Sequence, residues 1–346
     1  MKTIKVAAAA LLALAACTEL PEGGRAVDFS EECTLTVDFT SSYTKATGQT
    51  VAMEDAINNV TLFVFRTEGG VKLDASTYAV VSPAATQAGS GTPYSVSLKC
   101  TVGSRKVYVL INAPEDITGS ITDEEDLLSH SSLLTENGTS NFFMMGSATA
   151  TLSGPKCTVK VPVSRKVASV RIDRITNMME AKAYQKDGLF VVNRIYLTNV
   201  VGLMKYDGST LPSALATEYW LARLEAQETP LIYDGSVNTT VNYGAERAYT
   251  TSHSFYAYPN DCAASETGIW TPRSTMLVIE ATLDGVKYYY PVAVGPLESN
   301  RQYVITDFII RRPGSESPWE TVHKSDASVQ IEVLPWGTPV ITSEEI

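Results

Sequence analysis

The sequence predicts an all-β protein built from two β-sandwiches in series, with helices as minor elements. Its 346 residues exceed the length of one average domain, and 44% of them are hydrophobic, which is enough to form a buried core. Many short segments alternate apolar and polar residues and are separated by turn residues, which is typical of sandwiches. We expect the boundary near Ser164, with domains over 46–164 and 165–346.

The clearest strand runs from Cys33 to Thr40. Cys33, Leu35, Val37 and Phe39 share one face, and polar residues occupy the positions between them. Strict alternation of this kind indicates a half-buried strand. In chain order, further strands are predicted over 57–66, 94–101, 106–112, 142–151, 158–163, 167–175, 189–200, 275–283, 286–294, 301–311 and 327–333.

Turn and helix signals are fewer than strand signals. The Asp-Gly pair at 284–285 lies between two strand segments and predicts a two-residue hairpin. Thr122 followed three residues later by Glu125 has the spacing of a capping box, which predicts a helix over 123–134. A second, weaker helix pattern covers 213–226.

The first residues have the order of a bacterial lipoprotein signal peptide. Lys2 and Lys5 precede an apolar stretch that ends in Leu14-Ala15-Ala16, directly before Cys17. The stretch is shorter than the roughly 20 apolar residues that a membrane-spanning helix needs. We therefore expect a signal peptide over 1–16 and export of the chain. Cys17 would then carry a diacylglyceryl group and acyl chains such as palmitate, which hold the precursor to a membrane. An ordinary secretory signal with a chance cysteine is the alternative.

Charge and motifs exclude several classes of function. The 27 Lys and Arg residues against 38 Asp and Glu give a net charge of −11, which argues against nucleic-acid binding because that needs clustered cations. The sequence contains no hydrolase, nucleotide-binding or zinc-protease motif, and its three His residues are far apart. The acidic run 123–126 suits the first turn of a helix better than an ion site. His253 lies between two serines without a motif-bearing nucleophile. We expect no enzymatic activity, metal site or cofactor.

The five cysteines have no C-x-x-C spacing, so neither a zinc ribbon nor a redox motif is indicated. Besides Cys17, the sequence contains Cys33, Cys100, Cys157 and Cys262. Export would permit disulfides among these four. A pairing of Cys100 with Cys157 and four buried free thiols are both left open.

Both ends of the chain share a characteristic arrangement with one family. The lipobox cysteine is followed by an alternating strand, a polar loop with Lys45-Ala46, and a hydrophobic strand over 57–65. Near the other end lie the segments 298–305 and 329–336. This arrangement resembles the precursors of fimbrillins, the type V pilins of Bacteroidales, over essentially the whole chain. The resemblance implies two tandem transthyretin-like, Greek-key β-sandwiches.

The resemblance also implies maturation by proteolysis and strand exchange. A trypsin-like protease would cut between Lys45 and Ala46 and remove the propeptide 17–45, with Arg25-Ala26 as the competing site. Loss of the first strand would open a groove, which the C-terminal segment 327–346 of the next subunit would fill. The displaced strand would carry Cys33, Leu35, Val37 and Phe39, and the donor strand would carry Val329, Ile331, Val333 and Trp336.

The physical argument for strand addition is independent of the family. A sandwich that lacks an edge strand exposes unpaired backbone groups beside an apolar trough, and a strand of matching alternation can fill it. Head-to-tail addition does not close on itself, so it generates a filament. Alternatively, 327–336 is simply the last strand of the second sandwich.

Two functions follow as hypotheses. In the first, the chain is a structural pilin subunit that joins identical or related subunits in a cell-surface fimbria and supports adhesion and biofilm formation. It would pass from the outer membrane to the extracellular fimbrium, and its receptor is not named by the sequence. In the second, it stays anchored as a surface lipoprotein, either a fimbrial anchor or tip subunit or an adhesin for a glycan or protein.

Overall fold

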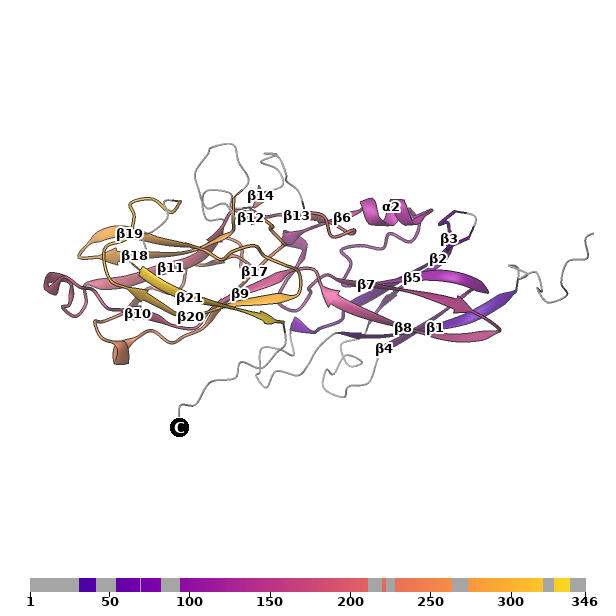
Figure 1. The fold of residues 1–346 in the computed structure, drawn as a ribbon, viewed down its shortest axis with the longest axis horizontal. Coiled ribbons are helices and arrows are strands. Elements are labelled where there is room, and N and C mark those ends of the chain that lie inside the picture. Colours follow the sequence, from indigo (N-terminus) through magenta and orange to yellow (C-terminus); the bar gives the residue numbers. More distant parts are fainter. Residues whose placement is uncertain are drawn as a thin grey trace, which may run out of the picture.

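The computed structural model describes residues 31–41, 54–68, 70–81, 94–210, 220–221, 228–262, 273–319 and 327–336. Within these ranges the fold is dominated by β-strands, as predicted, and the strands form two groups that lie end to end (Figure 1). The first group ends with Arg165 and the second begins at Ala168. No helix in the described part of the chain is both long and apolar enough to cross a membrane.

The N-terminal group is a seven-stranded sheet that folds over on itself. Its strands are β1 (Glu32–Ser41), β2 (Asn59–Arg66), β3 (Leu73–Val80), β4 (Tyr94–Thr101), β5 (Gly103–Ile111), β7 (Met144–Leu152) and β8 (Lys156–Arg165). Their order across the sheet is β3-β2-β5-β7-β8-β1-β4. Only Met144 and Met145 of β7 pair with β8, so the sheet turns there. β8, β1 and β4 form a layer whose apolar side chains share one core with those of β2 and β5.

The C-terminal group has two main sheets. The strands of the first are β9 (Ala168–Ile172), β10 (Ile175–Asn177), β17 (His253–Ala257), β20 (Arg301–Ile310) and β21 (Ala327–Pro335). Their order is β10-β20-β9-β17, and β21 is a further partner of β20 that lies off this path. The second sheet contains β11 (Phe190–Thr198), β15 (Tyr233–Asp234), β16 (Thr239–Thr240), β18 (Met276–Leu283) and β19 (Val286–Ala293). The predicted Asp-Gly hairpin connects β18 and β19, and Asp284 and Gly285 both have positive φ.

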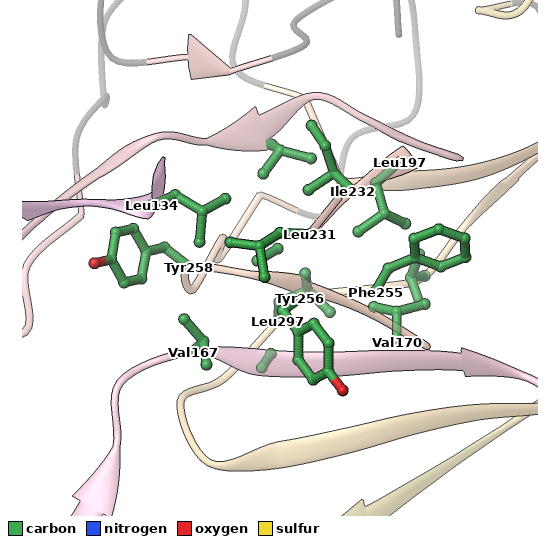
Figure 2. Close-up of a cluster of buried hydrophobic side chains, with 14 of the residues drawn as sticks. Leu134, Val167, Val170, Leu197, Leu231, Ile232, Phe255, Tyr256, Tyr258 and Leu297 are labelled. Atoms are coloured by element: carbon green, nitrogen blue, oxygen red, sulfur yellow. The ribbon is translucent and has the colours of Figure 1, made fainter. Parts of the chain in front are cut away.

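The remaining elements are short, and some of them connect the two groups. They are α2 (Glu124–Ser129), β6 (Ser131–Leu133), β12 (Val200–Val201), β13 (Leu203–Lys205), β14 (Trp220–Leu221) and three short 3₁₀ turns, Leu134–Glu136, Lys182–Tyr184 and Ala245–Arg247. β6 follows the N-terminal strand β5 in the chain but pairs with β13 of the C-terminal half. Figure 2 shows Leu134 of the adjoining turn beside Tyr258, and the Tyr258 hydroxyl donates to Ser132 Oγ at 2.8 Å. The two halves therefore share a buried junction.

Both helix predictions need correction. α2 ends at Ser129, because the next residues pair with β13 and cannot continue the helix. The helix is capped by Asp123, whose carboxylate accepts from the Asp126 backbone N–H at 3.0 Å, and not by Thr122. Most of the expected helix at 213–226 lies outside the described residues, and Trp220 and Leu221 within it form strand β14.

Candidate strand-exchange site

The first strand lies in the middle of its layer. β1 pairs antiparallel with β4 over Glu32–Phe39 and parallel with β8 over Thr34–Ser41. The expectation that it is an edge strand is therefore wrong: two neighbours depend on it for backbone hydrogen bonds. If β1 left, unpaired N–H and C=O groups would face each other across the gap from both β4 and β8.

The inner face of β1 is the one that its alternation predicts. Cys33, Leu35, Val37 and Phe39 are between 0% and 2% exposed, and they pack in the core with apolar residues of β2 and β5. Burying one such side chain contributes about 1.5–3 kcal/mol, so the four together contribute roughly 6–12 kcal/mol. That is comparable to the whole stability of a typical domain. A domain without β1 therefore needs another strand in the same place.

A second set of contacts, made by Asp74, fixes β4, the strand on one side of β1. Asp74 on β3 accepts hydrogen bonds of 2.8 Å from the backbone N–H and the hydroxyl of Thr101, at the end of β4. Asp74 also pairs at 3.0 Å with the fully buried Arg105, and Arg66 lies 2.9 Å away. Burial alone would raise the pKa of Asp74, but the Thr101 hydrogen bonds and the two guanidinium groups outweigh it and hold the pKa below its usual value. The charged Asp74 therefore ties β4 to β3 on the side away from β1.

The expected donor strand is an edge strand of the C-terminal group. β21 pairs antiparallel with β20, and no other described strand pairs with it. Val329 and Ile331 are partly buried against the core, whereas Val333 is 55% exposed. The apolar face of β21 is thus much less buried here than that of β1.

Trp336, directly after β21, is an exception because it is only 3% exposed. Its indole N–H donates a 3.0 Å hydrogen bond to Glu54, and the Arg165 guanidinium lies over its ring at 4.5 Å from the centroid. The rings of Tyr256 and Phe142 each lie 5.7 Å from it. Arg165 and Phe142 belong to the N-terminal half and Tyr256 to the C-terminal half, so Trp336 fills the junction between them.

Several expected site residues lie outside the described residues. These are Cys17, the two candidate cleavage sites Arg25-Ala26 and Lys45-Ala46, and the segment 337–346. Lys45 comes shortly after the end of β1 at Ser41, and Glu54 is the first residue described beyond it. The cleavage candidate is therefore bracketed by the strand to be removed and by the partner of Trp336.

Of the two alternatives left open for the cysteines, the structure has free thiols and no Cys100–Cys157 pair. Cys100 and Cys157 lie on β4 and β8, on opposite sides of β1, and the four described cysteines are free thiols. Cys33 lies on β1 between them, and its thiol interacts with both. Sequence spacing could not show this, because it depends on the order of strands in the sheet.

The side chains considered for catalysis or metal binding have structural partners. In the acidic run, Asp123 pairs with Lys72 at 2.9 Å, and Glu124 contacts Lys106 and Tyr108. No group of three or more His, Cys, Asp or Glu among the described residues could hold a metal ion.

His253 has the same structural character. Its ring nitrogens contact Asp234 and Tyr249, each at 2.8 Å, whereas the Ser252 hydroxyl donates to Asp173. The neighbouring serine is therefore not presented to the imidazole as a nucleophile.

Known proteins resemble this chain in sequence over part of its length and in fold over most of it. Residues 33–160, from β1 into β8, match the family model of the major fimbrial subunit protein (FimA). No curated protein sequence matches the chain. Among solved structures, a fimbrilin (FimA) from Porphyromonas gingivalis W83 aligns with a TM-score of 0.60 and 16% identity, over 88% of this chain and 97% of that one. Candidate cell adhesion proteins from Bacteroides eggerthii and Parabacteroides distasonis align with TM-scores of 0.61 and 0.63 and identities of 19% and 16%. They cover 96% and 98% of their own lengths and 88% and 89% of this chain.

The resemblance to fimbrillins noted in the sequence is confirmed, and a family of structural fimbrial subunits agrees with the expectation that the chain is not an enzyme. The chain thus matches the FimA family of major fimbrial subunit proteins in sequence over residues 33–160, and its described part has the fold of a fimbrilin.

Proposed function

We propose that the chain is a fimbrial subunit that polymerises head to tail by protease-triggered strand exchange. The observation that carries this proposal is the central position of β1 between β4 and β8. A removable strand in that position leaves a groove lined by backbone groups on both sides and by the core of the sandwich below. Such a groove binds an incoming strand much more tightly than a single free edge does.

The precursor is exported with the signal peptide 1–16 and anchored in the outer membrane through acylated Cys17. A trypsin-like protease cuts after Lys45, which separates the propeptide with its lipid and β1 from the rest of the chain. Arg25 is a weaker candidate, because a cut there leaves β1 joined to the sandwich. The released subunit then joins a cell-surface fimbria that serves adhesion and biofilm formation.

The C-terminal segment 327–346 of the next subunit supplies the replacing strand. Its residues Val329, Ile331 and Val333 have the same period as Leu35, Val37 and Phe39 of β1. The partial burial of β21 supports this role, since an edge strand with an exposed valine loses less on leaving its sheet than a central strand does. Because one subunit's strand fills the next subunit's groove, the contact repeats without closing.

The test is to treat the precursor with a trypsin-like protease and to follow both its new N-terminus and its oligomeric state. We expect Ala46 as the N-terminal residue and a ladder of oligomers that resists mild detergent. Lys45→Ala should abolish the ladder, and Arg25→Ala, the matched control, should leave it unchanged. Oligomers that form from the Lys45→Ala variant as readily as from the wild type would refute the proposal.

The second candidate is an anchored surface lipoprotein, a fimbrial anchor or tip subunit that keeps its first strand. The pairing of β21 with β20 favours it, because β21 already has a place in its own sandwich. In that case the protein recovered from cells retains acylated Cys17, and deletion of 331–346 leaves its attachment intact.

A further inference from the structure

Three thiols gather around the beginning of β1. Cys33 lies directly opposite Cys100 in the antiparallel pairing of β1 with β4, and the two residues are 1% and 5% exposed. Cys157 lies on β8 opposite Leu35, two residues further along β1. Three of the four described cysteines therefore lie on β1 or on its two neighbouring strands, and β1 is the strand whose removal the proposed function requires.

The register selects one pair among the three thiols. Directly opposite residues of an antiparallel pair have Cα atoms about 4.5–5.5 Å apart, which lies within the roughly 4.4–6.8 Å that disulfides span. Cys100 and Cys157 are separated by β1 itself, so they are about two strand spacings, or ~9.5 Å, apart. Cys157 is opposite Leu35, so it is displaced from Cys33 by about 6.6 Å along the strand in addition to one strand spacing. Cys33 and Cys100 are thus the pair that can be bridged without moving a strand.

We propose that Cys33 and Cys100 form a disulfide that clamps β1 to β4, so that only the reduced precursor can release its first strand. In the reaction, the two thiols lose two protons and two electrons to an external disulfide, such as oxidised glutathione or the disulfide of an oxidoreductase. That reagent is converted to two thiols while the bond between the two sulfurs forms. This inference rests on the proposed function, because the clamp matters only if β1 must leave.

The proposed disulfide would retain the propeptide because of where Cys33 lies relative to the cleavage site. Cys33 lies on the N-terminal side of Lys45, and Cys100 lies on the part that remains. A cut after Lys45 therefore leaves the propeptide covalently attached through the disulfide, and β1 continues to occupy the groove. Reduction returns both thiols and frees the strand.

Oxidation is expected during folding and not afterwards. Burial raises the pKa of Cys33 to about 12 and that of Cys100 to about 11. The thiolate is the form that attacks a disulfide, so the folded thiols react very slowly at neutral pH. The redox state during export and folding thus decides whether a given molecule is clamped.

The first experiment maps the bond in the uncut precursor. The full chain is unfolded with reductant and refolded either in a glutathione redox buffer or with reductant, and its free thiols are then blocked with N-ethylmaleimide. Trypsin produces peptides 26–45, 100–105 and 157–160, each with one cysteine. We expect peptide 26–45 joined to 100–105 only after oxidative refolding. A link to 157–160, or complete blocking of all three thiols, would overturn the assignment.

The second experiment tests the clamp by cutting the refolded precursor in its native state and separating released propeptide by size exclusion. We expect no release from the oxidised sample until dithiothreitol is added, and immediate release from the reduced one. Cys33→Ala should release under both conditions, whereas Cys262→Ala, the matched control, should keep the redox dependence. Equal release from both refolded samples would overturn the clamp. A mapped disulfide with no release even after reduction would instead count against strand removal, and hence against the proposed function.

Discussion

The indole N–H of Trp336 donates a 3.0 Å hydrogen bond to a carboxylate oxygen of Glu54, which joins two residues 282 positions apart. The other carboxylate oxygen accepts from the Tyr256 hydroxyl at 2.5 Å. Glu54 follows the proposed cleavage site in the chain, and Trp336 belongs to the proposed donor segment 327–346. The two segments that must rearrange during assembly are thus bound to each other at the junction of the two halves.

This contact predicts that Trp336→Ala destabilises the protein and loosens β21. Removing a buried tryptophan leaves a cavity and an unpaired Glu54 oxygen, and we expect a loss of about 3 kcal/mol in the free energy of unfolding, measured in urea. Trp319, 37% exposed, provides the control, and Trp319→Ala should have a much smaller effect. Equal losses for the two variants would show that the junction does not depend on the indole.

A substitution in the donor strand should separate folding from assembly. Ile331 is only partly buried on β21, but in the groove it would take the place of a fully buried β1 residue. We expect Ile331→Asp to abolish oligomers after cleavage, because an unpaired carboxylate buried in the groove costs several kcal/mol. The same change at the exposed Gln330 should have little effect. The measurement is the oligomer ladder together with the circular dichroism spectrum of the uncut monomer, and a normal ladder from Ile331→Asp would exclude 327–336 as the donor.

The Asp74 network should be essential for the stability of the N-terminal group. Asp74→Ala leaves Arg105 buried without its carboxylate and removes both Thr101 hydrogen bonds. Breaking a buried ion pair on one side costs about 3–5 kcal/mol, and we expect a loss of that order in urea denaturation. Asp187→Ala, which removes the surface pair with Arg247, should change stability little. A small effect at Asp74 would show that β4 is held by β1 alone.

Asp55 predicts a pH dependence of opposite sign to that of most carboxylates. Burial raises its pKa from 3.8 to about 6, although the Arg165 guanidinium nearby acts in the other direction. The folded state thus favours protonated Asp55, and its contribution to stability is complete below pH 4 and is lost as the pH rises through 6. The difference amounts to at most about 3 kcal/mol.

The check is the difference in unfolding free energy between the wild type and Asp55→Asn at several pH values. The asparagine is neutral throughout, so the variant should gain stability relative to the wild type as the pH rises from 4 to 7. Carboxylates with lowered pKa, such as Asp74, affect both proteins alike and cancel in the comparison. A difference that stays constant over this range would contradict the raised pKa.

Local pattern accounts for much of the fold. The alternation of Cys33, Leu35, Val37 and Phe39 predicts both a strand and the face that it buries, because side chains of a strand alternate between core and solvent. The Asp-Gly hairpin between β18 and β19 follows from the positive φ that such a turn requires. β3 was missed, because seven of its eight residues are partly buried and one is exposed, so it lacks a clear apolar face.

The sequence by itself thus determined an all-β chain, an alternating first strand that precedes a candidate cleavage site, and a C-terminal strand of the same period. Only the tertiary structure decided that β1 is central and not an edge, that Cys33 faces Cys100, and that Trp336 fills the junction beside Glu54. The physical reason is that alternation depends on neighbours one or two residues away, whereas strand order depends on contacts between segments far apart in the chain. Alternation with a period of two residues shows which face of a strand is buried. It contains no information about which strands lie on either side.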